Sequence, residues 1–121
     1  MNDMRLGLVE AKFADLIWEH EPLSSSELVK LAAQKLQWKK STTYTVLRRL
    51  CEKGIFQNVD GAVSSRLSKQ EFSALQSEQF VDETFDGSLP SFVAAFVSRK
   101  SLTAKEAEEI QRMIDAFKKE K

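Results

Sequence analysis

The first half of the chain carries apolar residues at spacings of three and four, which is the period of an amphipathic helix. The second of these segments begins with Ser24 and has Glu27 three residues later, the arrangement of a capping box. The third is followed by Gly54, a residue type that commonly ends a helix in the left-handed conformation. The pattern therefore predicts three helices, which lie within residues 7–21, 24–37 and 38–54.

A short β-hairpin is predicted directly after Gly54. Residues 55–59 and 62–67 flank Asp60-Gly61, a pair that favours the type I′ turn. Two strands alone are marginally stable in water, so the hairpin must pack on the helices. Three helices plus a β-hairpin wing form the winged variant of the helix-turn-helix, and we expect such a domain over residues 1–68.

The remaining residues, 69–121, carry signals for three more helices. Ser68 and Glu71 repeat the capping-box spacing, and Asp86-Gly87 is a stop signal. Pro90 lies near the start of the next helix, where a missing N–H is tolerated. A last helix opens after Leu102. The predicted fold class is therefore mainly α: a winged helix-turn-helix followed by a helical arm.

This arm is predicted to be a dimerisation region. Three helices in about 50 residues cannot enclose a good core alone, so their apolar stripes need a partner. The stripes either fold back on the first domain or meet a second copy; we favour a homodimer, because an appendage after a complete domain is most simply an oligomerisation arm. The predicted dimerisation residues are Phe80, Phe85, Leu89, Phe92, Val93, Phe96, Ile110, Ile114 and Phe117.

The third predicted helix has an unusual outer face. Its inner stripe is Thr43, Val46, Leu47 and Leu50. The outer face mixes cations, hydroxyls and one aromatic ring, a combination suited to phosphate oxygens and base edges. An ordinary solvated helix face explains this mixture equally well when the helix is considered alone. The outer residues are Lys40, Ser41, Tyr44, Thr45 and Arg48.

The charge distribution favours the nucleic-acid interpretation. The formal net charge is zero. However, residues 30–69 hold nine basic and two acidic side chains, whereas residues 1–29 hold two and six, and residues 70–121 hold seven and ten. A central basic block between acidic ends is a local electrostatic signature of nucleic-acid binding.

Several other function classes are excluded by composition. Cys51 and His20 are the only residues of their types, so neither a disulfide within one chain nor a metal site is expected, and no cofactor is predicted. No nucleophile–His–acid set or Gly-rich phosphate loop is present, which argues against an enzyme. The chain shows no signal peptide and no apolar run near the ~20 residues of a membrane helix, so we expect a cytoplasmic protein.

The residues together resemble the penicillinase-repressor family, which includes methicillin-resistance and copper-transport repressors. The resemblance runs from Leu6 to about Phe117. Its carriers are Leu6, Glu10, Ile17-Trp18, Trp38, Thr42, Thr45, Leu47, Arg49-Leu50, Lys53-Gly54 and the spacing through Asp86-Gly87-Ser88-Leu89 into a Phe-rich helix.

The resemblance implies a homodimeric repressor that binds an inverted-repeat operator in double-stranded DNA, often with TACA/TGTA half-sites. Two third helices would enter successive major grooves about 10 bp apart. Thr42, Thr45 and Arg49 match the family's recognition region; Tyr44 and Arg48 are added from their position on the helix. The predicted DNA-binding residues are Lys39, Lys40, Ser41, Thr42, Tyr44, Thr45, Arg48, Arg49 and Arg66.

The chain also departs from the family pattern. Lys39-Lys40-Ser41 stands where Ser-Pro-Lys is usual, and the hairpin has Arg66 as its only cation, so an altered operator preference and a weaker wing contact are expected. In penicillinase repressors an Asn-Phe bond in the dimerisation region is cut to relieve repression. The matching pair here is Ala95-Phe96, which stays a candidate cleavage position, with a sensor protease as a candidate partner. The C-terminal Cys cluster of copper repressors is absent.

A rival interpretation is a winged-helix module that binds another protein instead of DNA. Such a module would use its outer faces as a docking surface. Its binding would not depend on the basic block and would persist at high salt. Salt dependence therefore separates the two interpretations.

Overall fold

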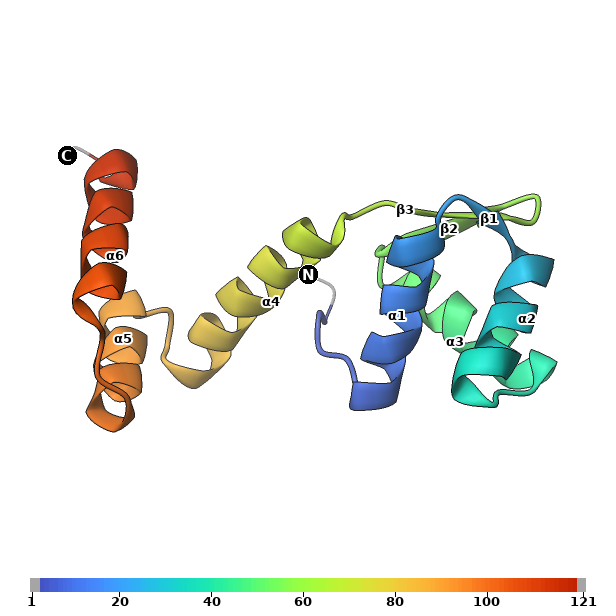
Figure 1. Ribbon diagram of the computed structural model, residues 1–121, viewed down its shortest axis with the longest axis horizontal. Helices are drawn as coiled ribbons and strands as arrows, with labels where there is room; N and C mark the ends of the chain where they lie inside the picture. Colours follow the sequence, from blue (N-terminus) through green and yellow to red (C-terminus); the bar gives the residue numbers. More distant parts are fainter. Residues whose placement is uncertain (1–2, 120–121) are drawn as a thin grey trace. The chain divides into compact units, whose positions relative to one another are not determined.

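The computed structural model describes residues 3–119. Within this range, helices and short strands follow in the order expected for a winged helix with a helical extension (Figure 1). The helices are α1 Leu8–His20, α2 Ser25–Leu36, α3 Lys40–Glu52, α4 Lys69–Thr84, α5 Leu89–Arg99 and α6 Ala104–Phe117. The strands are β1 Leu23–Ser24, β2 Phe56–Val59 and β3 Ala62–Ser65. The predicted fold class is confirmed.

The predicted local signals act as expected at the helix starts. Ser24 Oγ accepts from the Glu27 backbone N–H at 3.0 Å, and Glu27 Oε1 accepts from the Ser24 backbone N–H at 3.3 Å. Ser68 and Glu71 make the same reciprocal pair at the start of α4, at 3.0 and 2.8 Å. These bonds satisfy backbone donors that a helix leaves unpaired in its first turn, so they define where α2 and α4 begin.

The turns also have the backbone conformations that the sequence predicts. Gly54 has φ 84° at the end of α3. Asp60 and Gly61 have φ 51° and 83°, the two positive values that a type I′ hairpin turn requires. β2 and β3 pair antiparallel around this turn, with Val59 opposite Ala62.

The sheet has a third strand that the sequence pattern did not predict. Leu23 and Ser24 form β1, which pairs antiparallel with β3 in the order β1-β3-β2. Leu23 lies opposite Val63, and both are buried. A strand of two residues is too short to show alternation, so only the tertiary pairing reveals it. This pairing ties the start of α2 to the hairpin.

The core of the first unit gathers one face of each of α1, α2 and α3 against the sheet. Its largest fully buried side chains are Phe13, Phe56, Ile17, Leu28, Leu50, Ile55 and Val63. Trp18 joins this core to α4: its ring lies 5.1 Å from Phe56 and 5.6 Å from Phe72, between centroids. Its indole N–H donates to the Leu67 carbonyl oxygen at 2.9 Å, so the apolar contact and the hydrogen bond act together.

The segment before α1 is fastened to both α3 and α4. Met4 is buried in the core. Its backbone N–H donates to Gln79 Oε1 at 2.7 Å, and its carbonyl accepts from Gln76 Nε2 at 3.0 Å. Lys53 Nζ, just after α3, donates to the Asp3 and Arg5 carbonyl oxygens at 2.9 and 3.0 Å. The first half of α4 is therefore part of the winged-helix unit.

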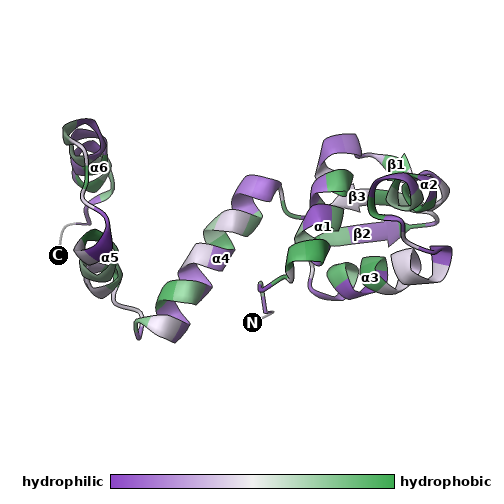
Figure 2. Ribbon diagram, turned by 60° about the horizontal axis from the view of Figure 1, so that its bottom comes forward, coloured by the Kyte–Doolittle hydropathy of each residue, from purple (hydrophilic) through white to green (hydrophobic). Residues whose placement is uncertain are grey.

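The chain divides into two compact units that meet within α4, between Gln79 and Phe80. From residue 80 to residue 119, no residue in the described part of the second unit is buried. Phe80, Phe85 and Phe92 form an edge-to-face cluster with centroids 5.6 to 6.0 Å apart. Apolar and polar positions are interleaved along α5 and α6 (Figure 2), and much of this apolar surface faces solvent.

Candidate nucleic-acid interface

The two faces of α3 separate as the sequence pattern predicts. Thr43, Val46, Leu47 and Leu50 are buried against α1, α2 and the sheet. On the opposite side, Ser41, Thr45 and Arg48 are exposed and lie along the centre of the outer face. Lys40 and Tyr44 lie on one flank of this face, and Thr42 and Arg49 lie on the other. We call this outer side of α3, from its N-cap residue Lys39 to Glu52, the reading face.

The first turn of α3 is left open for an anion. Its N-cap residue is Lys39, whose side chain makes no capping hydrogen bond. The first backbone bond of the helix runs from the Thr43 N–H to the Lys39 carbonyl at 3.0 Å. The N–H groups of residues 40–42 come before this bond and have no acceptor within the helix, and Lys39 and Lys40 are next to them in the sequence. A helix N-terminus with two adjacent cations attracts phosphate oxygens.

Some cations of the basic block, residues 30–69, make ion pairs within the described part of the protein, and others do not. Lys69 pairs with Asp15 at 2.9 Å. Arg49 Nη1 pairs with Glu10 Oε2 at 3.3 Å, with 56% of the Arg49 side chain exposed. Exposed pairs contribute about 0–1 kcal/mol, so this guanidinium can exchange Glu10 for another anion. The side chains of Lys39, Lys40 and Arg48, by contrast, contact no hydrogen-bonding or charged partner among residues 3–119.

Two hydroxyl groups of the reading face already donate hydrogen bonds within the protein. Thr45 Oγ1 donates to the Ser41 carbonyl oxygen at 2.9 Å, so this hydroxyl retains only its acceptor capacity. The Tyr44 hydroxyl donates to Ser25 Oγ at 3.2 Å, which holds its ring toward the start of α2. Ser25 is itself fixed, because its backbone N–H donates to the Gly61 carbonyl at 2.8 Å. Tyr44 therefore links α3, α2 and the hairpin turn.

The hairpin places its cation away from its tip. Arg66 follows β3, and its backbone N–H donates to the Ile55 carbonyl at 2.8 Å, at the base of the hairpin. The tip instead carries Asp60 and the exposed side chain of Val59. The structure brings eight of the nine predicted DNA-binding residues together on α3 and its N-cap and leaves Arg66 at the other end of the wing from the turn.

The sequence matches a known family over most of its length. The profile of the family described as "Penicillinase repressor" matches residues 6–116. The chain belongs to this family. The family consists of DNA-binding transcriptional repressors, so the chain is a transcriptional repressor and not an enzyme.

Two relatives illustrate the distance within the family. The chain is 24% identical over 116 residues to the penicillinase repressor of Bacillus licheniformis, covering 93% of this chain and 91% of that protein. It is 26% identical over 110 residues to the methicillin resistance regulatory protein MecI of Staphylococcus aureus, covering 88% and 89%. A MarR-family protein of Mycobacterium tuberculosis, solved in complex with DNA, aligns with 23% identity and a TM-score of 0.45 over 96% of this chain and 80% of that chain. At that score the likeness adds nothing to the fold described above.

Two residues near the reading face were missed by reasoning from the sequence. Glu52 lies on the same side of α3 as Ser41, Thr45 and Arg48 and is exposed, so it places a negative charge at the C-terminal end of this surface. Asn58 on β2 is exposed and lines the same pocket as Leu47 and Arg48, where the hairpin approaches α3. The helical period contains the signal for Glu52, whereas only the tertiary packing reveals Asn58.

Other candidate chemistry is weak in this repressor. Burial, followed by the nearby charge of Glu52, raises the pKa of the Cys51 thiol, which favours the unreactive protonated form. No cluster of His, Cys, Asp or Glu that could hold a metal ion occurs within residues 3–119. Over the same residues, every helix is too short or too polar to cross a membrane.

The predicted dimerisation residues lie on the second unit with large exposed fractions. Phe80, Leu89, Val93, Phe96, Ile110, Ile114 and Phe117 are between 42% and 82% exposed, while Phe85 and Phe92 are partly covered by the aromatic cluster. Val97, Leu102 and Met113 are also large, apolar and exposed, and they are not among the predicted dimerisation residues. The Ala95-Phe96 bond lies inside α5 in helical conformation, and both residues are exposed.

Proposed function

We propose that this repressor acts as a homodimer that binds an inverted-repeat operator in double-stranded DNA, with α3 of each protomer in a major groove. The observation that carries the proposal is the reading face of α3. Its open first turn and the side chains of Lys39, Lys40 and Arg48 present donors and positive charge that no described residue engages. A duplex supplies the matching acceptors on its phosphates and base edges.

Within this surface the residues take different roles. Lys39, Lys40 and the open helix start are placed to hold backbone phosphate. Ser41 and Thr45, at the centre of the face, are placed to reach base edges. Arg48 lies beside them, and its guanidinium suits either a backbone phosphate or the bidentate acceptor pair of guanine. Thr42 and Arg49 lie on the flank toward α1, where phosphate contact is the simpler assignment. Arg66 lies at the base of the wing and adds no more than a phosphate contact.

Homodimerisation is supported by the uncovered apolar surface of the second unit. On α6, Ile110, Met113, Ile114 and Phe117 recur at spacings of three and four and are 42% to 82% exposed. Fully burying one such side chain is worth roughly 1.5–3 kcal/mol. A second copy presents the same stripe and covers it symmetrically. This symmetry would pair two reading faces with two operator half-sites.

The dimer is tested by sedimentation equilibrium of the full chain. Ile114→Glu places a charge in the α6 stripe and is expected to yield monomer at concentrations where the wild type is dimeric. The control Arg112→Glu introduces the same side chain on the opposite side of α6 and is expected to leave the dimer intact. A wild-type chain that sediments as a monomer at tens of micromolar, or equal behaviour of the two variants, would contradict the dimer through this stripe.

The DNA-binding proposal is tested by selecting duplex fragments from a random pool with the purified protein and sequencing them. Recovery of an inverted repeat with half-sites about 10 bp apart is the expected result. Absence of any enrichment would instead favour the rival, a winged-helix module that docks on protein.

A further inference from the structure

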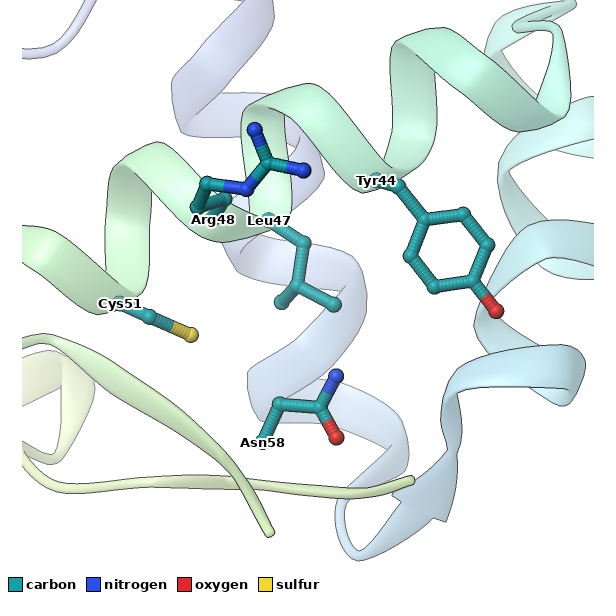
Figure 3. A pocket seen from close by; sticks show the side chains of 5 residues that line it. All are labelled: Tyr44, Leu47, Arg48, Cys51 and Asn58. Carbon is teal, nitrogen blue, oxygen red and sulfur yellow. The ribbon is translucent and has the colours of Figure 1, made fainter. Parts of the chain in front are cut away.

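A pocket lies between the reading face and the hairpin, and sequence reasoning assigned it no role. It has a volume of about 310 Å³ and opens to solvent. Figure 3 shows that α3 supplies most of its lining, while β2 contributes a side chain that points toward Leu47. The lining residues are Tyr44, Leu47, Arg48, Cys51 and Asn58.

The pocket combines an apolar floor with unengaged donors. Leu47 is only 2% exposed and forms the floor together with the Tyr44 ring and the neutral Cys51 thiol. The Arg48 guanidinium and the Asn58 amide bond to no other side chain or backbone group within residues 3–119. Guanidinium and amide together offer up to seven N–H donors, and no carboxylate lines the pocket. This chemistry selects an anion or a strong acceptor.

The place of the pocket on α3 indicates which part of a duplex it faces. Ser41, Thr45 and Arg48 define the centre of the reading face, and Tyr44 and Cys51 lie on the flank toward the hairpin. When a helix lies in a major groove, its central residues face base edges and its flanks face the sugar-phosphate strands that border the groove. The pocket therefore faces a strand, with Arg48 between base edges and backbone.

We propose, resting on the DNA-binding function above, that this pocket seats one backbone phosphate of the bound duplex. The Asn58 amide donates an N–H to it beside the Arg48 guanidinium. The pocket volume of about 310 Å³ suits a phosphate with its sugar, because it is at the low end of the roughly 300–1,000 Å³ of small-molecule sites. Asn58 would thus help to position the duplex, and the wing would contact the DNA through β2 instead of through its tip.

The test uses the full-length repressor and a duplex recovered by selection. Asn58→Asp places a carboxylate where the phosphate would lie, and Asn58→Ala removes the donor. The matched control is Gln57→Asp, on the neighbouring β2 residue, whose side chain instead donates to Ser64 Oγ at 3.1 Å. Because both positions are exposed, all three variants are expected to keep the wild-type unfolding temperature.

Mobility shifts are then measured on the native duplex and on a series in which one phosphate at a time is a neutral methylphosphonate. Asn58→Asp is expected to weaken binding at least about tenfold, and Gln57→Asp by less than about threefold. At one phosphate in each half-site, the methylphosphonate weakens wild-type binding but restores most of the affinity of Asn58→Asp, because the carboxylate then faces no charge.

Three results would overturn the assignment. The first is that Asn58→Asp binds the duplex as tightly as Gln57→Asp does. The second is that no single neutral phosphate restores binding by Asn58→Asp. The third is that Asn58→Ala relaxes the preference at one base pair, which indicates a base contact. These results are distinct from failure of the proposed function, in which the wild type binds no duplex at all. If the wild type binds the duplex and only the Asn58 variants give contrary results, the assignment of the pocket to a phosphate is wrong and the DNA-binding proposal is unaffected.

Discussion

Replacing Arg48 with alanine tests the electrostatic role of the reading face. Lys39, Lys40 and Arg48 are the cations of this surface that no described residue engages. If each meets one phosphate, and Arg49 keeps its pair with Glu10, a dimer makes about six such contacts. Each contact contributes about −0.9 to the slope of log K against log salt, so the wild-type slope should be about −5.4.

The variant loses one contact per protomer, and its slope should fall to about −3.6. Between 50 and 200 mM salt, wild-type affinity is then expected to fall roughly 2,000-fold and the variant's affinity roughly 150-fold. Fluorescence anisotropy of a labelled duplex, titrated at four or more salt concentrations, measures both slopes. If Arg48 instead binds a guanine, the variant loses preference at one base pair while its slope stays near that of the wild type.

The control is Lys105→Ala, which removes the same charge from the exposed first turn of α6. Its slope is expected to match the wild type, because local phosphate contacts and not the net charge determine counterion release. The reasoning is refuted if Arg48→Ala and wild type have the same slope. It is also refuted if both variants shift equally, since the effect would then be one of total charge.

The remaining predictions concern single side chains. Glu52→Gln is expected to tighten binding to random-sequence duplex several-fold at low salt, because it removes a negative charge from the reading face; a filter-binding titration checks this, and unchanged affinity speaks against it. Met4→Ala should cost about 2–5 kcal/mol in the free energy of unfolding measured with urea, whereas Leu8→Ala, with Leu8 76% exposed, should change it by less than about 0.5 kcal/mol. Cys51 should react with iodoacetamide at pH 8 more slowly in the folded than in the urea-unfolded protein, because burial raises its pKa; equal rates would contradict this.

The sequence predicts the elements of this fold well because their signals are local. Ser24 with Glu27 and Asp60 with Gly61 each act within four residues, and the structure contains the capping box and the type I′ turn that they predict. The inner stripe of α3 is likewise a property of the helical period.

The features that the sequence does not reveal depend on residues far apart in the chain. β1 exists because Leu23 meets Val63, and Glu10 lies near Arg49 only after α1 and α3 have packed. The candidate site shows the same limit. The cations of α3 were predictable from its period. Their division into paired and unpaired groups was not, nor was the place of Asn58 in a pocket that Arg48 also lines.

The central claim is that two copies of α3 read one face of a duplex. Hydroxyl-radical cleavage of the selected duplex, with and without the repressor, measures this most directly. The predicted result is symmetric protection of backbone segments about 10 bp apart on one face of the DNA, lost at the same protein concentration with Arg48→Ala. Uniform cleavage at saturating protein, or a single unsymmetric protected segment, would contradict the claim.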